Sequence, residues 1–341
     1  MLMAWTYWPA GPDVMYGAVF MALALALAMW IDYRFGEPPA AWHPVVWIGK
    51  YLQACGRVTA SCPPALAFVL GALAWCVGAV VTGALAWGLQ ALVFAQVLRW
   101  EVSLSLESMA GGPLLFLLMA WLLKAMLSWR MLRDEVAAVE AALQQSLGAG
   151  RQRLAMLVSR DTFDLSESEI RESAIESLAE NLNDSVVAPI FWFVLFGLPG
   201  AAVYRFANTA DAMWGYPGLR NGVNWAWAGK WAARADDLLS WLPARITALL
   251  LWLVTGGFKL RTLVDEARKT PSPNSGWPMA AMALALDVCL RKPGVYVLHG
   301  TGRSPIAPDI ALAQKYASKA VLAYVMSAQL AIILIATAKF V

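Results

Sequence analysis

Several apolar runs in this chain are long enough to cross a lipid bilayer, and they constrain its fold more than any other feature. Val14–Trp30 contains no charged residue, and Ala65–Leu98 is longer than one membrane thickness. A spanning helix needs about 20 apolar residues, because backbone groups in lipid must be satisfied within the segment. Only 14% of the residues are charged, against about a quarter in soluble domains. We therefore predict an all-α, polytopic integral membrane protein with a single domain over residues 1–341.

We expect about four spanning helices: Val14–Trp30, Ala65–Leu98, Gly111–Leu127 and Ala320–Ala338. Two further apolar runs, Val186–Val203 and Leu242–Phe258, either cross or dip in and return. If they cross as an ordinary pair, the basic segment Tyr204–Trp241 lies outside, against the positive-inside rule. We therefore prefer re-entrant or interfacial helices for these two runs. All polar clusters then face the cytoplasm, which predicts a cell inner membrane protein with its site on that face.

A stripe of carboxylates is the first candidate for chemistry. On a helix that begins near Ser166, residues Glu172, Glu176 and Glu180 fall at successive i,i+4 positions. Like charges stacked in this way repel one another, so the stripe requires a cation. Arg160 and Arg171 could supply it, and so could a bound divalent metal. The stripe alone leaves both possibilities open.

A second polar cluster follows directly. Asn181, Asn183 and Asp184 should close the acidic helix, and Asp184 or Ser185 should cap the next one, whose N-terminus would suit an anion. Farther on, Arg205, Asn208 and Asp211 at i,i+3,i+6 share roughly one helix face. Such groups beside lipid are costly without partners and indicate a functional site.

Other polar groups have a structural alternative of similar weight. His43 lies in a proline-punctuated loop with Asp32 and Glu37, and it is either catalytic or an interfacial histidine beside tryptophans. Arg234 and Asp237 either serve the site or form an interfacial ion-pair cluster. The segment around Lys230 is not a phosphate-binding loop, because Trp231 stands where Ser or Thr is required.

Two features argue against other classes of function, and a third indicates a class of substrate. The net charge is only +3 and the basic residues are scattered, so nothing indicates nucleic-acid binding. The four cysteines form no CxxC pair and only two histidines are present, which does not favour a zinc site. The proline-rich loop Thr270–Met279 is rigid and presents amide and hydroxyl donors, which suits a phosphate or amide substrate.

Six motifs resemble the CobD/CbiB family of membrane-bound cobalamin-biosynthesis proteins, adenosylcobinamide-phosphate synthase. They cover nearly the whole chain in family order: DYRFGEPPAAWHPVVWIG from Asp32, SRDT from Ser159, IESLAENLNDSVVAPIFW from Ile175, PGAAVYRFANTADAMWGY from Pro199, ARADDLLSWLPAR from Ala233 and SPNSGWPMAAMA from Ser272. Two departures stand out. Ser185 replaces the usual Gly, and Pro217–Trp231 is unusually rich in Trp.

The resemblance implies an ATP- and Mg²⁺-dependent ligase. It would join the propionate carboxylate of (adenosyl)cobyric acid to (R)-1-amino-2-propanol or its O-phosphate. The expected metal ligands are Glu176, Glu180, Asp184 and Asp211, and the expected catalytic residues are His43, Glu176, Glu180, Asp184 and Asp237. The expected cofactor-binding residues are Arg160, Asn181, Arg205, Asn208, Lys230, Arg234, Ser272, Asn274, Gly276 and Trp277.

Further expectations concern the partners and the alternatives. The corrinoid is expected as substrate, with tryptophans at 42, 214, 225, 227 and 277 as a possible wall for its macrocycle, although interfacial Trp more often anchors to lipid. A homo-oligomer is possible. The competing functions are an ion-coupled transporter and a non-enzymatic membrane regulator. A transporter is disfavoured because no paired repeat of apolar segments is visible and the polar residues gather at one face.

Overall fold

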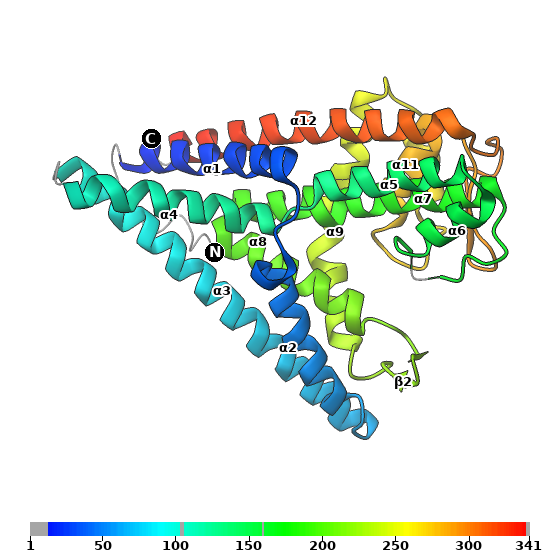
Figure 1. Cartoon of the computed structure of the whole chain (residues 1–341), viewed down its shortest axis with the longest axis horizontal. Coiled ribbons are helices and arrows are strands. Elements are labelled where there is room, and N and C mark those ends of the chain that lie inside the picture. The colour runs from blue at the N-terminus through cyan, green and yellow to red at the C-terminus, as the bar shows by residue number, and fades with distance from the viewer. Residues whose placement is uncertain (1–12, 103–105, 159, 339–341) are drawn as a thin grey trace. The chain divides into compact units, whose positions relative to one another are not determined.

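The computed structural model describes residues 13–102, 106–158 and 160–338, and nearly all of its regular structure is helical (Figure 1). The longer helices are α1 (Asp13–Phe35), α2 (Pro44–Thr59), α3 (Pro64–Val102), α4 (Leu106–Ala125), α5 (Trp129–Leu143), α7 (Glu167–Leu182), α8 (Ala188–Trp214), α9 (Lys230–Val254) and α12 (Ala307–Ala338). The shorter elements are η1 (Ala40–Trp42), α6 (Leu147–Leu154), η2 (Asn183–Val187), α10 (Leu260–Ala267) and α11 (Gly276–Leu286). The strands form two antiparallel hairpins, β1 (Leu219–Arg220) with β2 (Val223–Asn224) and β3 (Leu290–Lys292) with β4 (Tyr296–Leu298).

Six helical stretches of the described chain are long and apolar enough to cross a membrane: Gly17–Phe35, Pro64–Gln96, Pro113–Leu143, Glu167–Trp214, Lys230–Val254 and Ala307–Ala338. The prediction of an all-α polytopic membrane protein is confirmed. Four stretches correspond to the predicted spans, and the other two contain all or most of Val186–Val203 and Leu242–Phe258. Length and composition therefore allow six crossings, and the re-entrant interpretation stays a prediction.

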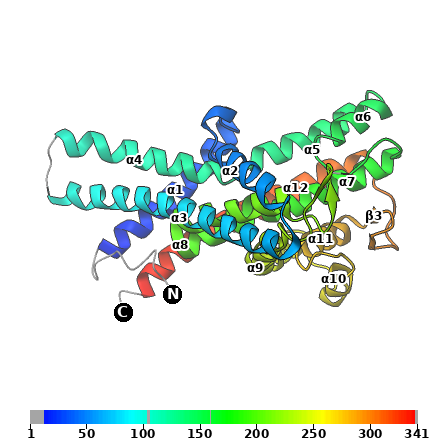
Figure 2. The same cartoon turned by 90° about the horizontal axis from the view of Figure 1, so that it is seen from below.

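Contacts divide the chain into two compact units. The first unit comprises Met1–Ser128, Ala188–Leu239 and Val325–Val341, and the second comprises Trp129–Val187 and Ser240–Tyr324. In the first unit α3 packs along α4 and α8, α4 lies beside α1, and α2 packs on α3 and α8 (Figure 2). In the second unit α7 packs on α5, α6 and α11 and carries the β3–β4 hairpin beside it. The carboxylate stripe of α7 thus belongs to the second unit.

Two glycines of α3 provide a paired test of the packing in the first unit. A Cβ atom at Gly78 would overlap the rings of Phe206 and Tyr51, whereas one at Gly88 would meet open space. We expect Gly78→Ala to lower the free energy of unfolding by about 1–3 kcal/mol through overpacking. Gly88→Ala should instead raise it by up to about 1 kcal/mol, because Ala favours helix. Unfolding in detergent micelles measures both, and equal effects at the two positions would contradict the packing of α3 against α8.

The start of α7 and the end of its α-helical part at Leu182 were predicted correctly, but the expected start of a separate helix at this point was not. Ser166 caps the helix in a reciprocal capping box with Glu169. The predicted break at Asn181–Asp184 is absent, because a π-helical turn over Asn183–Val187 carries the chain directly into α8. Asp184 and Ser185 therefore cap no helix, and there is no helix N-terminus at this point to hold an anion. Buried polar contacts of Asn183 replace the cap that its sequence position suggests.

The actual interruption lies farther along, within α8. Gly197 adopts φ 69° and ψ −156°, a backbone conformation that breaks the helix just before Pro199. The break frees the backbone N–H of Leu198, which donates to Oε1 of the buried Gln90 of α3 at 2.7 Å. A polar side chain of a long apolar helix thus accepts the backbone N–H that the break in α8 leaves without an intrahelical partner. Backbone groups in lipid need such a partner.

Two other boundaries complete the description of the second unit. The segment between Trp129 and Leu154 forms two helices rather than one, since α5 ends at Leu143 and α6 begins at Leu147 under the Ser146 cap. The predicted loop Thr270–Met279 ends early, because α11 begins at Gly276.

Candidate functional site

The carboxylates of α7 lie on one face of the helix, as the i,i+4 spacing predicted, and the first is held by an arginine. Glu172 is fully buried, and its Oε1 accepts from Nη2 of Arg291 at 2.6 Å while its Oε2 accepts from the Arg291 backbone N–H at 2.9 Å. Hydrogen bonds and the charge of Glu172 raise the pKa of Arg291 above its usual value. Glu172 is therefore an anchor for the β3–β4 hairpin rather than an open ligand.

Glu176, one turn later, is buried, and only one of its two carboxylate oxygens has a hydrogen-bond partner. Its Oε2 accepts from Nη2 of Arg160 at 2.5 Å, and the Arg160 side chain keeps 20% exposure. Its Oε1 is buried and has no hydrogen-bond partner in the described part of the chain. Tyr296 of β4 faces the same carboxylates, and burial together with the charges of Glu176 and Glu180 raises the pKa of its hydroxyl. Tyr296 is thus a protonated donor beside the stripe.

One of the two predicted arginine partners of the stripe is therefore confirmed, and the other is not. Arg160 does pair with Glu176, but Arg171 points to Glu140 and Glu167 instead, with its Nε donating to Glu140 at 2.8 Å. The cation on Glu172 comes from Arg291, which was not among the predicted partners.

The last carboxylates of the series are the accessible ones. Glu180 is exposed and Asp184, four residues later, is half-buried. Nδ2 of Asn183 donates to Asp184 at 2.8 Å, and its Oδ1 accepts from Thr247 of α9 at 3.1 Å. Asn183 therefore positions Asp184. Asn181, which was predicted to bind a cofactor, donates to the Ser177 carbonyl of its own helix.

The proline-rich loop is fixed by one arginine of α9. Arg245 donates to Oδ1 of Asn274 at 2.8 Å and to the Pro273 carbonyl at 3.1 Å. Its guanidinium lies 4.4 Å from the Trp241 ring centroid and 4.7 Å from that of Trp277. Ser272 adds to this rigidity, because its Oγ accepts the backbone N–H groups of Asn274 and Ser275. No Cβ fits at Gly276, where the carbonyl of Ala267 approaches.

The structure thus brings together the four loop residues predicted to bind a cofactor. Their mutual contacts are structural, and their ligand contacts stay a prediction. Arg245 was not among the predicted site residues.

In the first unit, four ionisable side chains form a buried network. Nζ of Lys124 lies 2.7 Å from Oε2 of Glu37 and 3.5 Å from Oδ1 of Asp32, and both Lys124 and Asp32 are at most 1% exposed. Nε2 of His43 lies 3.0 Å from the same Glu37 oxygen. Burial acts to raise the pKa of Glu37, but hydrogen bonds and charge from His43 and Lys124 outweigh it and lower the pKa below its usual value.

His43 has a structural role in this network. Its Nδ1 accepts the backbone N–H of Val45 at 3.2 Å and caps α2, while Nε2 faces Glu37. Both ring nitrogens are therefore engaged, and action as a general base would require the loss of one contact. The catalytic role of His43 stays a prediction, and it would require His43 to give up its contact with Glu37 or with the Val45 N–H.

Several predicted site residues of α8 and α9 in the first unit contact other side chains of the protein. Nδ2 of Asn208 donates to Asp236 at 3.5 Å, and Nη2 of Arg205 donates to Ser128 at 3.4 Å. Lys230 lies over the Trp227 ring at 4.4 Å. Arg234 is exposed, whereas Asp211 and Asp237 are half-buried.

The predicted metal ligands do not form a complete protein cage. Among the described residues, no three His, Cys, Asp or Glu side chains are placed to hold a metal ion. Glu176, Glu180 and Asp184 belong to the second unit and Asp211 to the first. Mg²⁺, however, is usually held by one or two carboxylates together with substrate phosphates. The accessible pair Glu180 and Asp184 fits that kind of site, whereas Glu176 is buried and already paired with Arg160.

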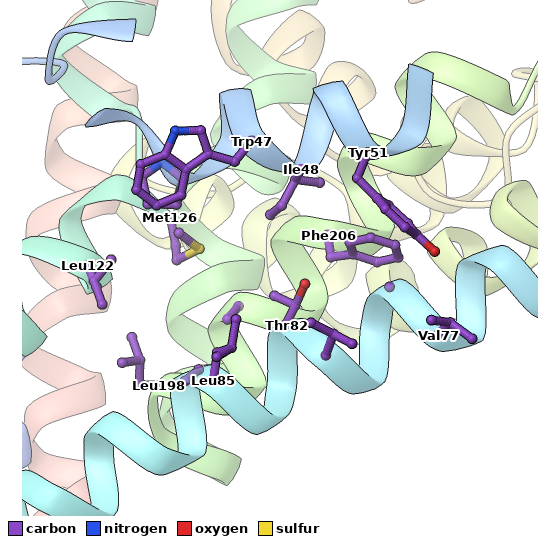
Figure 3. Close-up of a pocket in the computed structure, with 15 residues that line it drawn as sticks. Trp47, Ile48, Tyr51, Val77, Thr82, Leu85, Leu122, Met126, Leu198 and Phe206 are labelled. Atoms are coloured by element: carbon purple, nitrogen blue, oxygen red, sulfur yellow. The ribbon is translucent and has the colours of Figure 1, made fainter. Parts of the chain in front are cut away.

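An apolar cavity of about 360 Å³ lies in the first unit (Figure 3). Trp47 and Tyr51 of α2, Leu85 of α3 and Phe206 of α8 are among its lining residues, and the Tyr51 hydroxyl donates to the Ala74 carbonyl. A cavity lined in this way does not suit a travelling ion, which needs polar ligands.

A comparison with known protein families shows to which family the chain belongs. The family model described as CobD/Cbib protein matches residues 25–324. The chain belongs to the CobD/CbiB family. No solved structure gives a significant match.

CobD relatives from distant organisms cover most of the chain. The "Probable cobalamin biosynthesis protein CobD" of Methanothermobacter thermautotrophicus is 40% identical over 80% of this chain and 85% of its own length. The protein of the same name from Pyrococcus furiosus is 40% identical over 86% of this chain and 93% of its own. The "Cobalamin biosynthesis protein CobD" of Dehalococcoides mccartyi is 34% identical over 84% and 89%. These relatives support a role in cobalamin biosynthesis for the CobD/CbiB chain described above.

Proposed function

We propose that this chain is an ATP- and Mg²⁺-dependent ligase of cobalamin biosynthesis. It would form an amide between the propionate carboxylate of (adenosyl)cobyric acid and (R)-1-amino-2-propanol or its O-phosphate. The observation that carries the proposal is the α7 stripe, in which accessible carboxylates continue a buried series held by Arg291 and Arg160. Buried carboxylates are costly, and a series of them beside accessible ones indicates a functional site.

The proposed reaction has two steps. A propionate oxygen attacks the γ-phosphorus of ATP, a new P–O bond forms, and ADP leaves with the electron pair of the broken bond. The amine nitrogen then attacks the acyl carbon, inorganic phosphate leaves with the C–O electron pair, and a base takes the proton of the ammonium. Activation is necessary because a free carboxylate is a poor electrophile.

Residues of the second unit could serve this chemistry. Glu180 and Asp184 would hold Mg²⁺ together with phosphate oxygens of ATP, and the ion would supply charge neutralisation on the transferred phosphoryl group. Arg160 keeps partial exposure while it pairs with Glu176, so its guanidinium can also contact an anionic oxygen. Tyr296 stays protonated and can donate a hydrogen bond. Because ATP is cytoplasmic, the site would face the cytoplasm from the cell inner membrane.

The test uses the full-length protein in detergent or nanodiscs. Cobyric acid, ATP, Mg²⁺ and aminopropanol or its O-phosphate are supplied, and mass spectrometry identifies the product. We expect an amide that requires all four components, with one phosphate released per bond. Folded protein that forms no amide with either amine would overturn the proposal. Ion uptake into sealed proteoliposomes would then indicate the transporter alternative.

A further inference from the structure

A polar pocket of about 460 Å³ lies in the first unit, and none of its lining residues belongs to the carboxylate stripe. It is lined by the C-terminal half of α2, the last residues of α8 and the β1–β2 hairpin. We propose that this pocket binds the carboxamide-bearing edge of the corrinoid. The proposal rests on the proposed function, and it names the subsite that recognises the larger substrate.

Side chains with unpaired hydrogen-bond donors give the pocket its polar character. Gln53 and Arg57 are exposed one turn apart on α2, and neither side chain has a hydrogen bond or ion pair within the described part of the chain. Asn224 of β2 uses its Oδ1 to accept from the Ala226 N–H. No carboxylate lines the pocket. The pocket therefore offers one cation and amide groups to oxygen acceptors on a ligand.

A built aromatic wall borders these donors. The rings of Trp214 and Trp225 are stacked with centroids 6.3 Å apart and planes 15° apart. Trp214 is buried, and its Nε1 donates to the Leu52 carbonyl at 3.2 Å. Gly56 of α2 allows this approach, because a Cβ there would lie 2.7 Å from Nε1 of Trp214 and 2.8 Å from the Trp225 ring. The wall is thus held in place before any ligand arrives.

The helix directions decide between two kinds of planar ligand. A guanidinium and two indoles would suit a nucleotide as well as a corrinoid. However, the pocket lies at the C-terminal ends of α2 and α8, which end at Thr59 and Trp214. Helix C-termini carry partial negative charge and oppose a polyphosphate. Neutral carboxamides do not meet that repulsion, and a corrinoid is a flat macrocycle surrounded by carboxamide chains.

Equilibrium dialysis of coloured corrinoids against the full-length protein tests this assignment. The ligands are cobyric acid and cobinamide, which share the carboxamides but differ at the reacting carboxylate, and ATP is measured separately. We expect Arg57→Gln to weaken both corrinoids by about 10- to 100-fold, as the loss of a charge-assisted hydrogen bond predicts, and to leave ATP affinity unchanged. Trp225→Phe should weaken both corrinoids by about 2- to 10-fold.

Lys50→Gln is the matched control, since Lys50 is an exposed cation two turns earlier on α2 that does not line the pocket. It should bind all ligands as the unmodified protein does. Folded Arg57→Gln protein with unchanged corrinoid affinity would overturn the proposal. Loss of ATP affinity alone would also overturn it and assign the pocket to the nucleotide.

The outcome is separable from that of the proposed function. Amide formation with an unchanged corrinoid KM in Arg57→Gln would leave the ligase in place and reject the pocket. Arg57-dependent corrinoid binding without any amide product would do the reverse.

Discussion

Glu180→Ala and Asp184→Ala are each expected to lower kcat for amide formation by at least about 100-fold. The two carboxylates are the accessible members of the α7 series, so they can hold Mg²⁺ together with a phosphate oxygen. Asp184→Ala also removes the acceptor of the buried Asn183 amide, so the activity of each variant is compared at equal amounts of folded protein. Kinetics with saturating corrinoid and amine, over a range of Mg²⁺ concentrations, measure the effect.

Glu167→Gln serves as the control, because Glu167 lies at the start of the same helix with a side chain that is 63% exposed. It should keep nearly full activity. Full activity in both Glu180→Ala and Asp184→Ala, at normal Mg²⁺ dependence, would refute the metal assignment.

Lys124→Met is expected to destabilise the protein by about 3–5 kcal/mol. The substitution removes the cation shared by Glu37 and Asp32, and it leaves two carboxylates in an environment that hardly reaches solvent. The effect belongs to folding rather than to chemistry, so the loss should appear in the free energy of unfolding. Reversible unfolding in mixed micelles measures it.

Two further variants show whether the loss comes from buried charge. Lys269→Met removes an exposed cation that pairs with Glu266 at 2.6 Å, and it should cost less than about 1 kcal/mol. Adding Glu37→Gln to Lys124→Met should restore part of the stability, because one uncompensated charge is removed. Equal losses for Lys124→Met and Lys269→Met would contradict the buried network.

Local sequence signals predicted the features that depend on neighbouring residues. The apolar runs gave the spanning helices, and Ser166 with Glu169 gave the start of α7. The i,i+4 spacing placed Glu172 and Glu176 on one face. Arg160 lies near enough in the chain to be considered as a partner of Glu176, and it is one.

Features that depend on distant residues were missed for a physical reason. Glu172 and Arg291 are 119 positions apart, and no local pattern records that pairing. Tyr296 sits on a short hairpin, and Lys124 lies in an apolar run where it was read as part of a span. The π-helical turn was missed because Asn and Asp favour helix caps in isolation, whereas here Asn183 is stabilised by Thr247.

The most direct test of the central claim, that the enzyme activates a corrinoid carboxylate with ATP, is isotope transfer. Cobyric acid labelled with ¹⁸O in its propionate carboxylate is incubated with the protein, ATP, Mg²⁺ and the amine, and the released phosphate is analysed by mass spectrometry. We predict one ¹⁸O atom in inorganic phosphate for each amide formed. Unlabelled phosphate, or the label in AMP, would contradict this account.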